Sequence, residues 1–188
     1  MQMSSSIFFA SSNEHKFSEA KDILSKFGIK LQFLKSHLEE IQSDNMEEIA
    51  QHKANQAFSL CKKPVIIEDD GLFIKSLKGF PGPYSSFVFD TIGNKGILKL
   101  VSKDRAASFM SVIAYCEKED DVMLFDASVP GKISKRTHGI KWGYDPIFIP
   151  EGQTKTYSQL EKKNIVSHRY LALKKFANWY LHKQRSSD

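Results

Sequence analysis

Apolar and polar residues follow the period of a strand in some stretches of the chain and the period of a helix in others. The run at 7–10 is wholly apolar, which is typical of a buried strand. The run at 64–67 is also apolar and is followed at once by acidic residues. The strands that this pattern predicts lie at 7–10, 30–34, 64–67, 107–116, 121–134 and 143–149.

Helical spacing of apolar residues separates these strands. Asn13, Asp44 and Ser167 are the expected N-terminal caps of three helices. The expected helices run from Asn13 to Gly28, from Met46 to Cys61, from Gly93 to Val101 and from Ser167 onward. The order strand, helix, strand, helix, strand, then a hairpin and a last helix predicts an α/β domain with a mixed sheet.

Composition places the chain among globular proteins. Its 188 residues are 41% hydrophobic, which is enough for a good core. This size predicts one domain, either undivided or made of two lobes. No stretch is long enough to span a membrane, and the start of the chain lacks the order of a signal peptide, so we expect a cytoplasmic protein. Cys61 and Cys116 are expected to be reduced core thiols.

Positive charge is concentrated near the C-terminus. The net charge is +5, and the segment from Gly152 to Asp188 holds eight Lys or Arg against two acidic residues. Nucleic acid, nucleotide phosphates and plain solubility all fit this asymmetry.

Three consecutive carboxylates follow the apolar run at 64–67. Glu68 and Asp70 are expected to point to one face and Asp69 to the other. Neighbouring carboxylates repel unless a cation lies among them, and Mg²⁺ is usually held by one or two carboxylates together with substrate phosphates. The cluster therefore indicates a phosphate-ester substrate, with a solvated turn before Gly71 as the alternative.

Two predicted helix starts carry cations where acidic residues are usual. Lys16 lies in the first turn after Asn13, and His168 and Arg169 follow Ser167. Backbone N–H groups, the helix dipole and a cation together favour an anion, so both starts predict phosphate binding. A surface lysine is the alternative for Lys16, and a solvated cap is the alternative for Ser167-His168-Arg169. Trp142-Gly143-Tyr144-Asp145-Pro146 offers a flat wall and a polar edge for a base, or is simply core.

Five motifs occur in a fixed order along the chain. They are Ser11-Ser12-Asn13-Glu14-His15-Lys16, Glu68-Asp69-Asp70-Gly71-Leu72, Gly79-Phe80-Pro81-Gly82-Pro83-Tyr84-Ser85, Trp142-Gly143-Tyr144-Asp145-Pro146 and Ser167-His168-Arg169. In this order and at these separations the set resembles the inosine triphosphate pyrophosphatase (Ham1) family over essentially the whole chain. The stretches from Pro83 to Val88 and from Ile92 to Leu98 are most similar to archaeal members.

The resemblance implies a two-lobed α/β fold around a long mixed sheet, with one domain over 1–188 and an active-site cleft between the lobes. It also implies a homodimer, dependence on magnesium, and cleavage of inosine, deoxyinosine and xanthosine triphosphates to the monophosphate and pyrophosphate. No membrane and no stable nucleic-acid partner are expected.

The resemblance also implies roles for particular residues. Glu40 and Asp69 would hold magnesium, with Asp69 as the usual proton acceptor. Because a tight metal ligand cannot also be a free base, Glu68 or Asp70 is the alternative base. The substrate would be bound by Ser11, Ser12, Asn13, Glu14, His15, Lys16, Asp70, Trp142, Gly143, Tyr144, Asp145, Lys163, His168 and Arg169.

Three residues depart from the pattern of the family. Ser12 stands where glycine is frequent, Asp70 replaces a small residue, and Phe87 lies where bacterial relatives carry arginine. The last change makes the grip on phosphate depend more on Lys16 and Lys163.

Two other functions remain open from the sequence. A non-enzymatic binder of single-stranded nucleic acid would use Trp142 and Tyr144 as stacking platforms and the basic C-terminal helix as a track, but it leaves the acidic cluster unexplained. The second is a Maf-like pyrophosphatase acting on pyrimidine or modified nucleotides, which differs from a pyrophosphatase for inosine and xanthosine triphosphates only in its substrate.

Overall fold

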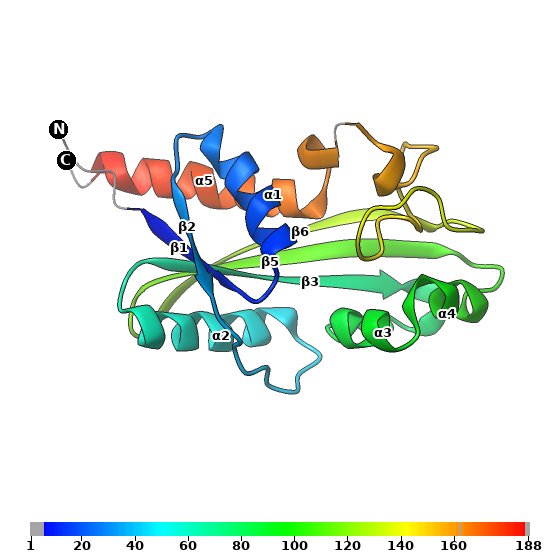
Figure 1. Cartoon of the computed structure of the whole chain (residues 1–188), viewed down its shortest axis with the longest axis horizontal. Helices are drawn as coiled ribbons and strands as arrows, with labels where there is room; N and C mark the ends of the chain where they lie inside the picture. Colours follow the sequence, from blue (N-terminus) through cyan, green and yellow to red (C-terminus); the bar gives the residue numbers. More distant parts are fainter. Residues whose placement is uncertain (1–5, 162, 187–188) are drawn as a thin grey trace. The chain divides into compact units, whose positions relative to one another are not determined.

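The structure is a computed structural model that describes residues 6–161 and 163–186. Within these residues a seven-stranded mixed sheet is flanked by helices (Figure 1). The strands are β1 (Ile7–Ser11), β2 (Leu31–Lys35), β3 (Val65–Ile74), β4 (Pro81–Gly82), β5 (Ala106–Lys118), β6 (Asp121–Ile133) and β7 (Phe148–Pro150). The helices are α1 (Glu14–Ser25), α2 (Met46–Cys61), α3 (Ser85–Thr91), α4 (Gly93–Leu100) and α5 (His168–Ser186), with short 3₁₀ turns η1 (Lys75–Leu77), η2 (Tyr157–Gln159) and η3 (Lys163–Ile165).

Parallel and antiparallel pairs are combined in the sheet. Its strand order is β2-β1-β3-β5-β6-β7, and β4 pairs with β3. β1 is parallel to both β2 and β3, whereas β4 is antiparallel to β3 and β7 is antiparallel to β6. The predicted α/β class with a mixed sheet is confirmed.

The chain divides into two compact units. Among the described residues, unit 1 comprises 6–69, 112–126 and 169–186, and unit 2 comprises 70–111, 127–161 and 163–168. The division crosses β3 between Asp69 and Asp70, and it separates His168 from Arg169 at the start of α5.

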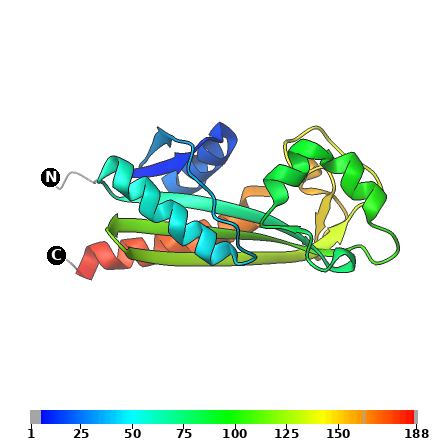
Figure 2. The ribbon, with the colours of Figure 1, turned by 90° about the horizontal axis from the view of Figure 1, so that it is seen from below.

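Unit 1 has helices on both faces of its strands. Figures 1 and 2 show α2 on one side of β1 and β3, and α1 and α5 on the other. Strands covered on both faces need apolar side chains on both, which is why 65–67 is an unbroken buried run. Its fully buried side chains include Ile7, Phe9, Ala20, Ile23, Leu24, Ala50, Ala54, Ile66, Ile113, Leu173, Phe176 and Ala177.

Unit 2 is built around the second half of β3, the start of β5, the end of β6, and the helices α3 and α4. One apolar cluster fills it, made of Leu72, Ile74, Val88, Ile97, Val101, Ala107, Phe109, Val129, Ile133, Tyr144, Ile147, Phe148 and Tyr157. Phe109 lies at the centre of its aromatic contacts, with ring centroids 5.4 Å from Phe148 and 6.4 Å from Tyr144.

Three predictions about the elements were wrong. The strand predicted to end at Ile67 continues through the acidic residues to Ile74, because Leu72 and Ile74 are buried beyond them and extend the core. Asn45 rather than Asp44 caps α2, since Asn45 Oδ1 accepts hydrogen bonds from the N–H groups of Glu47 and Glu48. Most of the predicted strand at 143–149 is turn, and only 148–150 pairs with β6.

Other expectations hold or fall outside the described residues. Asn13 caps α1, and Cys61 and Cys116 are free thiols, of which only Cys116 is buried. Burial raises the pKa of the Cys116 thiol. No described helix is long and apolar enough to cross a membrane. Residues 1–5, where we expect no export signal, lie outside the described part.

Candidate functional site

The turn between β1 and α1 is ordered by its own side chains. Asn13 Oδ1 accepts from the N–H groups of His15 at 3.0 Å and Lys16 at 3.2 Å, and Ser11 Oγ accepts from the N–H of Asn13 at 3.0 Å. These N–H groups are already satisfied, so binding of an anion here rests on the ammonium group of Lys16 more than the sequence indicates. That ammonium donates to the carbonyl of Glu68, 3.4 Å away on β3.

Glu68 and Arg169 form a buried ion pair in unit 1. Arg169 Nε donates to the two carboxylate oxygens of Glu68 at 2.7 and 2.9 Å, and its Nη1 contacts Glu19. The side chain of Arg169 is 2% exposed and that of Glu68 is fully buried. A buried charge is tolerated when it is paired and hydrogen-bonded, which both groups are.

Lys53, which belongs to none of the sequence motifs, joins the two predicted metal ligands. Its Nζ lies 2.7 Å from Glu40 Oε1 and 2.7 Å from Asp69 Oδ1. Asp69 Oδ2 is buried and has no hydrogen-bond partner among the described residues. The carboxylates thus converge on one cation, and Asp69 keeps an unsatisfied acceptor beside it.

Lys53 carried a signal in the sequence. It lies four residues after Ile49 and four before Ala57, both of which are buried on the core side of α2. A lysine on the apolar stripe of a helix is rarely buried unless it is paired, so its spacing alone points to a carboxylate partner.

Asp70 and His168 are neighbours within unit 2. His168 Nε2 lies 3.8 Å from Asp70 Oδ1, and both side chains are largely buried. The imidazole also stacks flat on Phe109, with ring centroids 4.1 Å apart and an angle of 3° between the planes. The stack and the carboxylate together fix the orientation of this ring.

The segment from Trp142 to Asp145 is anchored in unit 2 by its side chains. Tyr144 Oη donates to the Ser85 carbonyl at 2.8 Å, and Lys163 Nζ lies 2.7 Å from Asp145 Oδ2. Burial, with a smaller contribution from Asp90, raises the pKa of Tyr144, so the phenol stays protonated and can donate. Ser85 in turn accepts at Oγ from the Leu72 N–H and donates to the Gly82 carbonyl.

The structure thus brings many of the predicted site residues into contact within each unit. In unit 1, Lys16 reaches the backbone of Glu68, Glu68 pairs with Arg169, and Glu40 meets Asp69 through Lys53. In unit 2 the contacts are Asp70 with His168 and Asp145 with Lys163. Ser12, Glu14 and His15 are exposed, as is Phe87 on α3.

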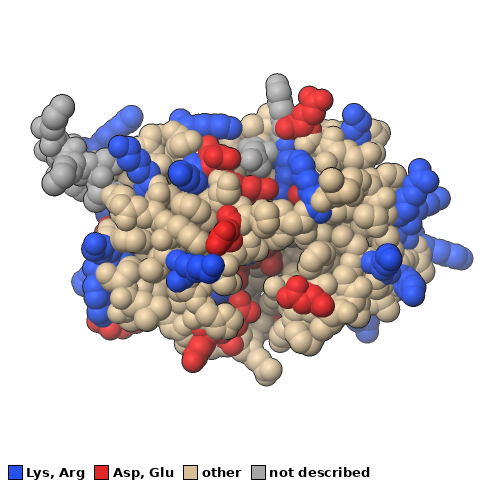
Figure 3. Space-filling view, viewed as in Figure 1, with Lys and Arg blue, Asp and Glu red and all other residues tan. Residues whose placement is uncertain are grey.

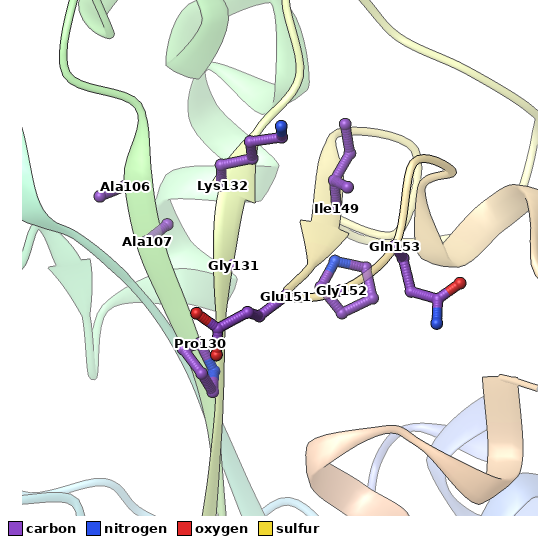
Figure 4. A pocket seen from close by; sticks show the side chains of 10 residues that line it. Ala106, Ala107, Pro130, Gly131, Lys132, Ile149, Glu151, Gly152 and Gln153 are labelled. Carbon is purple, nitrogen blue, oxygen red and sulfur yellow. The ribbon is translucent and has the colours of Figure 1, made fainter.

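A separate cavity in unit 2 lies beside β5, β6 and β7 (Figure 4). It measures about 400 Å³ and contains none of the predicted site residues in its lining. Lys132 and Glu151 are the charged side chains at its wall, while backbone, proline and alanine form most of the rest. It lacks the convergent polar groups that a specific ligand site needs.

Known proteins match the chain over nearly its whole length. The model described as the Ham1 family matches residues 7–179. A dITP/XTP pyrophosphatase of Methanopyrus kandleri is 47% identical over 93% of this chain and 95% of the relative, and one of Saccharolobus solfataricus is 45% identical over 89% of each.

Solved structures agree with the relatives. A HAM1 protein from Coxiella burnetii superposes with a TM-score of 0.80 at 28% identity, covering 94% of this chain and 98% of that one. The Ham1 protein of Staphylococcus aureus gives a TM-score of 0.79 at 29% identity, covering 95% and 99%. Together with the shared motifs and the contacts that they make, these matches show that the chain belongs to the Ham1 family.

Proposed function

We propose that this protein hydrolyses non-canonical purine nucleoside triphosphates, namely dITP, XTP and ITP, to the nucleoside monophosphate and pyrophosphate, and that the reaction depends on Mg²⁺. Relatives named dITP/XTP pyrophosphatase support the substrate class. The observation that carries the proposal is the convergence of Glu40 and Asp69 on one cation, with Asp69 Oδ2 unsatisfied. The protein would do this as a homodimer in the cytoplasm.

The residues around Asp69 fit a magnesium site in which the substrate supplies some of the ligands. No group of three or more His, Cys, Asp or Glu side chains suited to a metal occurs among the described residues. Two carboxylates are nevertheless the usual protein share of a magnesium site, since substrate phosphates and water supply the other oxygens. Glu40 and Asp69 would hold the ion, which when bound neutralises phosphate charge and makes water more acidic.

The two carboxylate oxygens of Asp69 have different surroundings. This difference supports one role for each oxygen, as magnesium ligand and as proton acceptor. Oδ1 contacts the ammonium of Lys53 at 2.7 Å, whereas Oδ2 has no hydrogen-bond partner among the described residues. Oδ2 is therefore the acceptor for the proton of the attacking water. Glu68, the alternative base, has its carboxylate in hydrogen bonds to Arg169.

The reaction that follows is an in-line displacement at the α-phosphorus. A bond forms between the water oxygen and phosphorus, the bond to the β-phosphate oxygen breaks, the proton passes to Asp69, and pyrophosphate leaves with the bonding electrons. Lys16 and Lys53 supply positive charge in unit 1 for the phosphate oxygens.

Selection of the base falls to unit 2. A purine with oxygen at position 6 needs a donor there, which His168 and the N–H groups of the segment 142–145 supply. Adenine would present an amino group to those donors and leave each unmatched at a cost of about 1 to 3 kcal/mol. Arg169 is the other candidate donor, and it already donates from Nε to Glu68 and from Nη1 to Glu19.

Two measurements test the proposal. The protein is incubated with Mg²⁺ and a panel of purine and pyrimidine triphosphates, and the products are identified. Preference for dITP and XTP supports the proposal, while preference for pyrimidine nucleotides favours a Maf-like enzyme. Asp69→Asn should lose more than about nine-tenths of turnover, over roughly 1.4 kcal/mol in barrier. Asp44→Asn, at an exposed residue, is the matched control.

The charges seen on one face do not form the track that the nucleic-acid alternative needs. On the face shown in Figure 3, acidic side chains lie among the basic ones. A binder of single strands follows the phosphate backbone with such a track. Salt-dependent binding of oligonucleotides without magnesium-dependent turnover would support that alternative instead.

A further inference from the structure

Asn94 connects α4 to the segment that carries the proposed base contacts. Its Nδ2 donates to the carbonyl of Gly143 at 3.0 Å, across 49 positions of sequence within unit 2. The orientation of the amide is fixed by chemistry, because a carbonyl only accepts and the nitrogen must therefore face it.

Gly143 is a position where backbone geometry depends on such a contact. Its φ is +62°, a region that other residues rarely adopt, and a Cβ added to it would meet no atom within 4 Å. Glycine is thus required there for conformation and not for space, and glycine is also the residue that leaves the backbone most freedom. The bond from Asn94 selects one orientation for the Gly143 carbonyl.

The other end of the same segment is held independently. Tyr144 is anchored to Ser85 and Asp145 to Lys163, and both Tyr144 and Asp145 are buried. Asn94 therefore adds its hold on the Gly143 side, next to the half-buried ring of Trp142.

The second atom of the Asn94 amide argues against a purely stabilising role. Asn94 Oδ1 is buried without a hydrogen-bond partner among the described residues. An unsatisfied buried acceptor destabilises a fold, so a leucine of similar size would serve at least as well if stability were the only role. The feature that asparagine adds at this position is therefore the Nδ2 donor, which holds the Gly143 carbonyl.

We propose that Asn94 is a positioning residue for base recognition: it holds the Gly143 carbonyl and so fixes the segment 142–145 in the conformation that meets the purine. This inference rests on the proposed function. Loss of the donor leaves the triphosphate chemistry in place but lets the segment move, so it weakens binding of the base and its discrimination more than it slows turnover.

The test compares Asn94→Leu, which removes both polar atoms, and Asn94→Asp, which turns an acceptor toward the carbonyl, with wild type. Lys95→Ala, at the exposed neighbour on α4, is the control. We expect a rise of about tenfold in KM for dITP, a narrower ratio of kcat/KM for dITP over dATP, and kcat within about twofold for both Asn94 variants. Asn94→Leu should keep its melting temperature within about 2 °C of wild type.

Amide hydrogen exchange of 141–147 without nucleotide gives a second measurement. It should quicken in both Asn94 variants and not in Lys95→Ala, because the segment opens locally when the contact is lost. Unchanged KM and exchange, or a loss of activity confined to kcat or matched by a fall in melting temperature, overturns the inference alone. A wild-type protein that does not hydrolyse dITP overturns the proposed function.

Discussion

Arg169 Nε donates to both carboxylate oxygens of Glu68, at 2.7 and 2.9 Å, and the two side chains are buried. The pair joins the start of α5 to β3 inside unit 1, between residues 101 positions apart. Arg169 is expected at the nucleotide from the sequence, and in the structure it joins α5 to the strand that carries Glu68 and Asp69.

A protein without the Arg169 side chain should therefore be less stable. Arg169→Ala removes the guanidinium that is hydrogen-bonded to the buried Glu68 carboxylate, which should lower the free energy of unfolding by about 3 to 5 kcal/mol. Urea titration measures the loss. Arg185→Ala, at an exposed position of the same helix, should change it by less than about 0.5 kcal/mol.

A double variant shows whether the ion pair is the cause. Glu68→Gln combined with Arg169→Met removes both charges and should regain a large part of the stability lost by Arg169→Ala. The single variants Glu68→Gln and Arg169→Met are measured beside it. If the double variant loses as much free energy of unfolding as the two single variants lose together, the two residues act separately and the pair does not explain the loss.

The Lys53 ammonium should act as a substitute cation in the absence of metal. Lys53→Met leaves Glu40 and Asp69 close together without a counter-charge, and carboxylates so placed repel. The variant should melt at a lower temperature in metal-free buffer, and Mg²⁺ should raise its melting temperature more than it raises that of wild type. It should also lose about tenfold or more in kcat/KM.

Lys175→Met is the matched control for this prediction, because Lys175 forms an exposed ion pair with Asp126. Such surface pairs contribute about 0 to 1 kcal/mol. An equal response of both lysine variants to Mg²⁺ would show that the cation does not bind between Glu40 and Asp69.

Phe109 should matter for catalysis through His168. Phe109→Leu keeps an apolar side chain but removes the flat surface on which the imidazole stacks. We expect kcat/KM for dITP to fall about five- to tenfold, in keeping with an aromatic contact of about 0.5 to 1.5 kcal/mol. Phe125→Leu removes another buried phenylalanine, packed on Phe176 and Trp179, and should reduce stability without this loss. Comparable kinetics for the two variants would reject the role of the stack.

Tyr144 should make stability depend on alkaline pH. Burial holds the pKa of Tyr144 in the folded protein above the value of about 10 that the unfolded chain has. Its contribution is thus complete below pH 10 and is lost as the pH rises toward the folded pKa. Tyr144→Phe should cost about 1 kcal/mol at pH 7, the value of a typical hydrogen bond.

The pH dependence of that difference is the measurement. Denaturant unfolding is measured at pH 7, 9 and 11. The difference in free energy of unfolding between wild type and Tyr144→Phe should close at pH 11, because ionisation of the Tyr144 phenol in the unfolded chain lowers the stability of wild type alone. A gap that stays constant across the three pH values would mean that the Tyr144 phenol does not carry the effect.

Local patterns were sufficient for much of the fold. The strand at 7–10, the cap at Asn13 and the hairpin of 106–133 depend on residues that are neighbours in sequence, and the structure has all of them. The extension of β3 to Ile74 was missed because Asp70 and Gly71 are usual turn residues, and only packing against distant apolar residues keeps them in a strand.

The contacts within the candidate site were less accessible to sequence reasoning. Lys53 meets Asp69 across 16 positions, Asn94 meets Gly143 across 49, and Tyr144 meets Ser85 across 59. No periodic pattern encodes which partner a polar side chain finds at such separations. The motifs identify the residues of the site, whereas tertiary packing decides their hydrogen bonds.

Hydrolysis in water enriched in heavy oxygen tests the proposed reaction most directly. The protein, Mg²⁺ and dITP are incubated, and the products are weighed by mass spectrometry. Attack at the α-phosphorus places one heavy oxygen in the nucleoside monophosphate and releases unlabelled pyrophosphate. Heavy oxygen in pyrophosphate, or orthophosphate as the first product, would show attack at another phosphorus and would contradict the assignment.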